Sequence, residues 1–206
     1  MNIMDTNSAV SWLRKADEYI QDKKDHLTKL DQATGDGDHG VNMARGFSEV
    51  VKKISDADYQ APGEVFKDAA MTLMSKIGGA SGPLYGTAFL RLSTICKDDN
   101  PVDLPVFAKA LQAATEGIKQ RGKAEAGEKT MIDVWEPVSN YFQEATSLDA
   151  GKLVETAENA MEATKDLTAT KGRAAYFKER SKGAVDPGAA SSYYIFSALA
   201  EVLKGV

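Results

Sequence analysis

The sequence predicts an all-α protein, with residues 1–206 forming a single domain of about eight antiparallel helices in an up-and-down helical barrel. Apolar residues recur at spacings of three, four and seven along most of the chain, which is the period of an amphipathic helix. No convincing run of alternating or β-branched residues would form a sheet. The connections are short, which favours antiparallel packing of consecutive helices. A length of 206 residues with 43% hydrophobic content is sufficient for one full core.

Two apolar stripes define the first helical segments. The first consists of Leu13, Ala16, Ile20, Leu27 and Leu30, and the second of Ala44, Phe47, Val51 and Ile54. Further helices are predicted over residues 62–77, 83–97, 104–121, 130–147, 150–168, 172–181 and 187–204. Prolines stand near first-turn positions, where a missing amide costs nothing, at Pro62, Pro83, Pro105 and Pro187. The last segment is apolar around most of its circumference, so we expect it to be central.

Charge and cysteine content exclude several classes of function. The formal net charge is -5 and the chain has no basic cluster, which argues against nucleic acid as a ligand. Cys96 is the single cysteine, so no internal disulfide can form, and its apolar helical setting predicts a buried, inert thiol. No apolar run approaches a membrane span and the N-terminus lacks the pattern of a signal peptide. We therefore expect no membrane association and a cytoplasmic location.

The loop before the second stripe is rich in aspartate and glycine. Its glycines allow a short loop to fold back so that Asp36 and Asp38 converge, and Asp31, at the end of the preceding helix, can close the ring. Carboxylate oxygens without cysteine or clustered histidine suit magnesium or calcium, and magnesium in particular shares substrate phosphates. The loop therefore predicts a divalent-cation site.

This loop has two other interpretations. An EF-hand fails on register, because with Asp36 in its first position the obligatory turn glycine would be Val41 and the bidentate glutamate would be Phe47. A solvated turn that caps the next helix stays open as an alternative, since aspartate and glycine are common turn residues.

Three further stretches are unusual for simple connections. Residues 78–86, Gly-Gly-Ala-Ser-Gly-Pro-Leu-Tyr-Gly, run into a helix start whose free amides attract phosphate oxygens, although close helix packing through small residues is an alternative. Residues 120–131 are polar and punctuated by glycine, with part of a capping box at their end. Residues 171–188 concentrate cations and end in an Asp-Pro helix start. Because loops before alternate helices of an up-and-down bundle lie at the same end, we expect all these loops to share one rim.

The motifs in these loops resemble the L subunits of bacterial dihydroxyacetone kinases. The similar blocks are Gly-Asp-Gly-Asp-His-Gly at 35–40, the glycine loop at 78–86, Arg-Gly-Lys-Ala-Glu at 121–125, Lys-Thr-Met at 129–131, Lys-Gly-Arg-Ala at 171–174 and Asp-Pro-Gly-Ala at 186–189. The similarity runs from the first helix to the last. A small departure is Glu128, where relatives are expected to have aspartate, and it lies beside the motif.

This resemblance implies a helical barrel that binds ADP or ATP at one end through two magnesium ions. The implied magnesium ligands are Asp31, Asp36 and Asp38. The implied nucleotide contacts are His39, Gly40, Val41, Asn42, Ala80, Ser81, Gly122, Met131, Arg173, Asp186, Pro187 and Gly188. No protein nucleophile is expected on the chain. His39 is therefore expected to contact phosphate or to support a ligand, with a phosphoryl-carrier role left open, and His26 to be a surface histidine without function.

The resemblance also implies a partner-dependent phosphotransferase, a phosphoenolpyruvate–glycerone phosphotransferase of the phosphotransferase system. A phosphohistidine M subunit would phosphorylate the retained ADP, and the ATP formed would phosphorylate dihydroxyacetone on a K subunit. The alternatives are a nucleotide-binding unit of an ATP-dependent glycerone kinase and a non-catalytic module that docks a partner such as a transcription regulator. The expected assembly of the chain itself is a homodimer.

Overall fold

The structure is a computed structural model that describes residues 1–205. Within this range the α-helices are α1 (Thr6–Asp22), α2 (Lys24–Thr34), α3 (His39–Ser55), α4 (Pro62–Lys76), α5 (Ser81–Ile95), α6 (Leu104–Gly122), α7 (Ile132–Glu144), α8 (Ala150–Ala163) and α9 (Pro187–Val202). The remaining elements are the 3-10 helices η1 (Thr164–Asp166), η2 (Arg173–Ser181) and η3 (Leu203–Gly205) and the strands β1 (Asn2–Met4) and β2 (Val102–Asp103).

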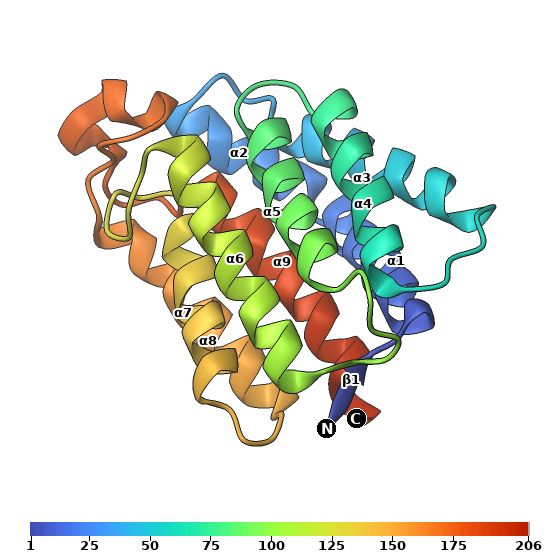
Figure 1. Cartoon of the computed structure of the whole chain (residues 1–206). Coiled ribbons are helices and arrows are strands. Elements are labelled where there is room, and N and C mark those ends of the chain that lie inside the picture. Colours follow the sequence, from blue (N-terminus) through green and yellow to red (C-terminus); the bar gives the residue numbers. More distant parts are fainter. Residues whose placement is uncertain (206) are drawn as a thin grey trace.

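The helices form a closed ring, which confirms the predicted all-α up-and-down barrel (Figure 1). Neighbours pack in the order α1, α3, α4, α5, α6, α7, α8 and α9, and α9 packs back on α1. Helix α9 is buried over most of its surface, as its apolar sequence predicts. The helix α2 is additional to this ring and packs on α3.

The prediction of one helix for the first stripe is wrong, because the chain breaks at Lys23 into α1 and α2. Lys23 has φ -97 and ψ 8, and its amide still bonds to the carbonyl of Tyr19. Ile20 and Leu27, on either side of the break, still keep a helical spacing in the sequence. The apolar stripe therefore gives no sign that one helix ends and another begins. The break lets α2 turn onto α3 and carry Asp31 in its last turn.

Two later segments also differ from the predicted helices. The segment at 150–168 ends as an α-helix at Ala163 and continues as η1, and residues 173–181 form the 3-10 element η2, within which Lys178 has φ 49. A 3-10 helix is used in short pieces and is less regular than an α-helix, so the sequence period alone does not distinguish it. The glycine-loop helix begins at Ser81, which places Pro83 within its first turn, where no intrahelical donor is needed.

The structure also contains a small sheet that the sequence did not predict. Strands β1 and β2 pair antiparallel at the end of the barrel where the chain termini lie (Figure 1). Strands of three and two residues are too short to show an alternating pattern. This sheet lies away from the loops that connect α2 to α3 and α4 to α5.

An aromatic cluster centres the core on Trp12. The Trp12 ring lies 5.7 Å from the ring of Phe66, 5.6 Å from Phe89 and 6.2 Å from Phe107, measured between centroids. The Trp12 Nε1–H donates to the carbonyl of Ile195 at 2.9 Å, so the ring also joins α1 to α9. These contacts stabilise the barrel wall on which the loops at its ends are mounted.

Two predictions about single residues are confirmed. Cys96 is fully buried, and burial raises the pKa of its thiol to about 12, so it stays protonated and inert. His26 is exposed on α2, as expected of a surface histidine. In the described part of the chain no helix is both long and apolar enough to span a membrane.

Candidate functional site

A cavity of about 190 Å³ lies where the loops before α3, α5, α7 and α9 meet. These loops share the end of the barrel opposite the termini, as predicted from the up-and-down order (Figure 1). The cavity is lined by most of the predicted site residues: Asp31, Asp36, Asp38, His39, Asn42, Ala80, Ser81, Met131, Arg173, Asp186, Pro187 and Gly188. Residues 171–174, from the segment between α8 and α9, form its outer side.

The three predicted aspartates form one cluster. An oxygen atom from each of Asp31, Asp36 and Asp38 lies within 4.8 Å of the others. Asp31 Oδ2 accepts hydrogen bonds from the backbone amides of Asp38 at 2.9 Å and His39 at 3.0 Å, which folds the loop back onto α2. A Cβ at Gly35 would lie 2.2 Å from Asp31 Oδ1, so the loop needs glycine there.

The electrostatics of this cluster fit a divalent cation. Partial desolvation raises the pKa of the Asp38 carboxyl, and the negative charges of Asp36 and Asp31 act in the same direction. Arg173 makes an ion pair with Asp36, which offsets part of this charge. Carboxylate oxygens grouped this closely are the donor set that magnesium prefers, and a cation would relieve the repulsion that remains. The residues present therefore fit the implied metal.

His39 is buried between two serine hydroxyls. Its Nε2 lies 2.9 Å from Ser191 Oγ, and its Nδ1 lies 3.2 Å from Ser81 Oγ. Burial lowers the pKa of His39 to about 4, so the ring is neutral near pH 7, with one nitrogen as donor and the other as acceptor. The histidine thus ties the start of α3 to the starts of α5 and α9.

Tyr85 extends these contacts into the core. Its hydroxyl lies 2.6 Å from Ser191 Oγ and 2.9 Å from Ser192 Oγ, and it donates to the carbonyl of Gly188 at 3.1 Å. The Trp135 Nε1–H donates to Ser192 Oγ at 3.0 Å. A continuous set of buried hydrogen bonds therefore links α5, α7 and α9 beneath the cavity.

Replacing Tyr85 with phenylalanine should lower the free energy of unfolding by about 1–3 kcal/mol, because Ser191 Oγ, Ser192 Oγ and the Gly188 carbonyl each lose one of their hydrogen-bond partners. Thermal unfolding of the ligand-free chain measures this loss. The matched control is Tyr176→Phe, since the Tyr176 side chain is 86% exposed and should tolerate the change within about 0.5 kcal/mol. Equal unfolding temperatures for Tyr85→Phe and the unmodified chain would contradict this role.

The glycine loop contributes a helix start to the cavity wall. Gly79 has φ +67 with open space around it, and Ala80 and Ser81 follow at the start of α5. The first amides of a helix have no intrahelical partner and attract anions. Arg45 anchors the loop from α3, since its Nε donates to the carbonyl of Lys76 at 2.9 Å.

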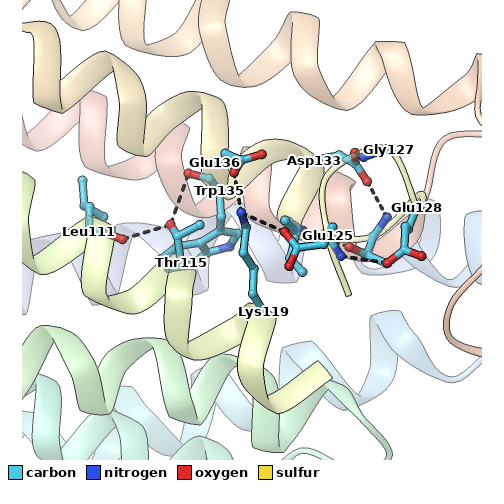
Figure 2. A network of polar contacts seen from close by, with 11 residues as sticks. Leu111, Thr115, Lys119, Glu125, Gly127, Glu128, Asp133, Trp135 and Glu136 are labelled. Carbon is cyan, nitrogen blue, oxygen red and sulfur yellow. Dashed lines mark hydrogen bonds and ion pairs between the residues drawn. The ribbon is translucent and has the colours of Figure 1, made fainter. Parts of the chain in front are cut away.

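The loop between α6 and α7 is held by a partly buried lysine (Figure 2). Lys119 on α6 bonds to Glu136 on α7 at 2.5 Å and to Glu125 in the loop at 3.1 Å. The hydrogen bond with Glu136 is the main cause that raises the pKa of Lys119 to about 12. The lysine side chain is 13% exposed, but Glu125 is 73% exposed, so solvent screens that ion pair more than the pair with Glu136.

Asp133 fixes the far side of the same loop. Its Oδ1 accepts from the amide of Gly127 at 2.5 Å (Figure 2), and its Oδ2 accepts from the amide of Thr130 at 2.7 Å. Thr130 Oγ1 in turn accepts from the amide of Ile132 at 3.1 Å. Only the carboxylate half of the predicted capping box is present, in which Asp133 bonds back to the Thr130 amide. The Asp133 amide bonds to the Thr130 carbonyl instead of the Thr130 hydroxyl, and the N-cap of α7 is Met131.

The Asp-Pro turn at 186–188 starts α9 as predicted. Asp186 Oδ2 accepts from the amide of Ala189 at 2.8 Å, and Pro187 occupies the first helical position. Burial raises the pKa of Asp186 to about 7, against the opposing effect of the Ala189 amide. A cation placed in the cavity would favour the ionised form of this carboxyl.

A second, more apolar cavity of about 460 Å³ adjoins the first. The residues that line both cavities are Ala80, Leu84, Thr130, Met131, Lys171 and Gly172. The residues that line the second cavity alone are Pro83, Ile118, Arg121, Gly122, Ala124 and Ile132. Gly122 thus lines the adjoining cavity and not the first one, and its contact with a nucleotide stays a prediction.

Gly40 and Val41 line neither cavity. A Cβ at Gly40 would lie 2.1 Å from the carbonyl oxygen of Lys24, so this residue faces α2, and Val41 is 50% exposed. Both are in the first turn of α3, where backbone amides lack intrahelical partners. Gly40 and Val41 could contact phosphate only through their backbone amides, and this contact stays a prediction.

Sequence reasoning missed three side chains that build the site: Tyr85, Lys129 and Ser191. Tyr85 and Lys129 lie inside the motifs at 78–86 and 129–131. Their place in these motifs is the only feature of the sequence that indicates a role in the site. Ser191 is one of several small residues on α9, and nothing in its local pattern indicates a contact with His39.

The all-α barrel and the sequence that builds this cavity place the chain in a known family of helical domains. The chain belongs to the DAK2 domain family, whose model matches residues 33–201. It is 50% identical over 195 residues to the "PEP-dependent dihydroxyacetone kinase 1, ADP-binding subunit DhaL" of Listeria innocua, covering 95% of this chain and 96% of the relative. It is 45% identical over 198 residues to the "PTS-dependent dihydroxyacetone kinase, ADP-binding subunit DhaL" of Lactococcus lactis, covering 96% of this chain and 97% of that relative. These findings confirm the resemblance in the motifs.

A solved structure shares the fold. The dihydroxyacetone kinase of C. freundii in complex with AMP-PNP and Mg2+ superimposes with a TM-score of 0.68 at 23% sequence identity. The match covers 97% of this chain and 34% of that chain, so the present chain spans about a third of that kinase. The similarity supports the barrel architecture.

Proposed function

We propose that this chain is the ADP-binding subunit of a phosphoenolpyruvate-dependent dihydroxyacetone kinase. The observation that carries the proposal is the convergence of the aspartate cluster, the glycine-loop helix start and Arg173 on one cavity. Relatives named as ADP-binding subunits match almost the whole chain at up to 50% identity, which supports the same assignment.

In this proposal the phosphates of ADP occupy the first cavity and the base occupies the apolar second cavity. Asp31, Asp36 and Asp38 would hold two magnesium ions, which neutralise phosphate charge. The amides of Ala80 and Ser81 would bind phosphate oxygens from the opposite wall. This arrangement also explains how a chain with formal net charge -5 binds an anion.

The residues of this chain would position the nucleotide phosphates and neutralise their charge, and none is needed as a nucleophile. Phosphoryl transfer depends mainly on alignment and charge compensation. His39 is neutral and held by Ser81 and Ser191, so its role is to orient the glycine-loop hydroxyl at the site. We propose that ADP is retained, phosphorylated by the phosphohistidine M subunit, and used as ATP for dihydroxyacetone on the K subunit.

Reconstitution tests this function. Purified chain is mixed with phosphoenolpyruvate, the general phosphotransferase proteins, the K and M subunits and dihydroxyacetone, and dihydroxyacetone phosphate is measured. We expect product with the unmodified chain and none with the Asp38→Asn variant. A complete mixture that forms no sugar phosphate would overturn the proposal.

The retained nucleotide separates the proposal from an exchanging ATP-dependent kinase. We expect mass spectrometry of freshly purified, denatured chain to detect ADP. Chain that contains no nucleotide but forms dihydroxyacetone phosphate from added ATP and K subunit would instead support the exchanging kinase.

A further inference from the structure

A lysine side chain is buried beside the cavity. Lys129 is 1% exposed. Its Nζ donates to the carbonyl oxygens of Thr164 at 2.6 Å, Ala184 at 2.7 Å and Leu167 at 3.2 Å. A protonated amine has three N–H donors, so these contacts use all of them. The ammonium therefore has no donor left for a phosphate, and its function must lie in what the three carbonyls hold.

The three carbonyls belong to the two ends of one loop, residues 165–185 with their flanking residues. The amide of Gly183 donates to the carbonyl of Lys165 at 2.8 Å, and the amide of Asp186 donates to Thr164 Oγ1 at 3.0 Å, so the ends of the loop meet. Lys129 reaches them from the α6–α7 loop and bonds to both the outgoing and the returning end. These paired ends, residues 164–167 and 183–186, are the neck of the loop. A surface loop with adjacent ends is held largely by its own side chains and by the contacts at its neck.

Apart from this neck, the contact of η2 with α2 and the ion pair of Arg173 with Asp36, the 165–185 loop has few anchors. Its buried side chains are Ala169, Ala174, Ser181 and Val185, which provide little apolar area. Thr170 adds contacts to Glu128, from its Oγ1 to the carboxylate at 3.0 Å and from its amide to the carbonyl at 3.4 Å. In Figure 1 the 165–185 segment, coloured orange, lies beside the connection between α6 and α7. The polar contacts of Glu128 and Lys129 therefore join these two loops.

The 165–185 loop supplies one wall of the site. Lys171, Gly172, Arg173 and Ala174 line the cavity, and the Arg173 guanidinium pairs with Asp36 of the aspartate cluster. A loop with so little apolar anchorage keeps this geometry only if its neck is fixed.

We propose that Lys129 is a positioning residue: its buried ammonium fixes the neck of the 165–185 loop and thereby places Arg173 at the nucleotide phosphates. The placement of a nucleotide there rests on the proposed function, whereas the fixing of the loop does not. A neutral side chain of the same length would remove the lysine donor from the carbonyls of Leu167 and Ala184 and leave the Thr164 carbonyl with the Leu167 amide alone, so the neck would open.

Lys129→Met tests the proposal, with Lys123→Met as the matched control. Lys123 is an exposed lysine of the same loop and also has a positive φ, 50° against 62° for Lys129, so the control removes the same charge from a similar backbone setting. Hydrogen–deuterium exchange of the nucleotide-free chain is the first measurement. We expect amides within residues 165–185 to exchange at least about tenfold faster in Lys129→Met, with the helices of the barrel unchanged. Lys123→Met should match the unmodified chain.

A double-mutant cycle on the affinity for Mg·ADP is the second measurement. We expect Lys129→Met and Arg173→Ala each to weaken binding by about tenfold, and the double variant to be little weaker than either single variant. Losses that multiply would show that Lys129 does not act through Arg173 and would overturn the proposal. Unchanged exchange in the 165–185 loop would overturn it as well.

Two further outcomes keep the result decisive. If Lys129→Met does not fold, Lys129→Gln, which retains two N–H donors, should show faster exchange confined to the same loop, and unchanged exchange would reject the role. If the unmodified chain does not bind Mg·ADP, the proposed function fails, while the exchange measurement still decides whether Lys129 fixes the loop.

Discussion

Replacing Asp38 with asparagine should abolish the stabilisation of this chain by Mg·ADP without harming the ligand-free fold. A ligand present at about 100 times its Kd stabilises the native state by about 2.7 kcal/mol. For a chain of this size that corresponds to a rise of roughly 5–10 °C in Tm. The variant removes one carboxylate from the cluster of Asp31, Asp36 and Asp38, and we expect at least about a hundredfold loss of affinity.

The ligand-free Tm of Asp38→Asn should be equal to or slightly above that of the unmodified chain. The side chain of Asp38 is exposed, and its neighbours Asp36 and Asp31 repel its charge. Asp31→Ala is the instructive comparison, because Asp31 also accepts the amides of Asp38 and His39 and its loss should destabilise the ligand-free chain. Scanning calorimetry with and without MgCl2 and ADP measures both effects. Retention of ADP by Asp38→Asn through gel filtration in chelator would contradict the assigned metal role.

Gly40→Ala should destabilise the fold and the site together. On helix propensity alone, alanine would be favoured by about 1 kcal/mol. The added Cβ would lie 2.1 Å from the carbonyl oxygen of Lys24 and 2.8 Å from the amide nitrogen of Thr28, both backbone atoms of α2. Backbone overlap of this kind cannot be relieved by a rotamer change, so α2 must move from α3. We expect a net loss of about 1–3 kcal/mol or more.

Gly151→Ala is the matched control for this change. Gly151 is the second residue of α8, as Gly40 is the second residue of α3, but its Cβ would meet only the exposed side chain of Asp149, at 3.2 Å. Thermal unfolding should therefore show little change or a slight gain for Gly151→Ala and a clear loss for Gly40→Ala. The displaced α2 carries Asp31, so Gly40→Ala should also weaken Mg·ADP binding. Equal stability of the two variants would show that α2 does not pack on Gly40.

Local chemistry made much of the fold predictable. The helical period of the apolar residues, the prolines at helix starts and the N-cap at Asp186 depend on residues within a few positions of one another. The same holds for the aspartate loop, where glycines let Asp36 and Asp38 converge over a short distance. The shared rim followed from the up-and-down order alone, because alternate loops of such a bundle must lie together.

Contacts between distant segments were not predictable in this way. The apolar stripe continues through Lys23, so it could not reveal the break that turns α2 onto α3. The hydrogen bond between His39 and Ser191 and those from Lys129 to Thr164 and Ala184 join residues far apart in the chain. Such pairs form because the closed ring brings the helix ends together. The sequence around either residue gives no indication of its partner.

Most of the helices and the convergence of Asp31, Asp36 and Asp38 were therefore predictable from the order of amino acids, because short-range periodicity and turn chemistry encode them. The tertiary structure decided which loops face each other, that Gly40 packs on α2 instead of lining the cavity, and that a buried ammonium holds the 165–185 loop. The physical reason is that burial and hydrogen-bond partners over long separations exist only once the ring of helices has closed.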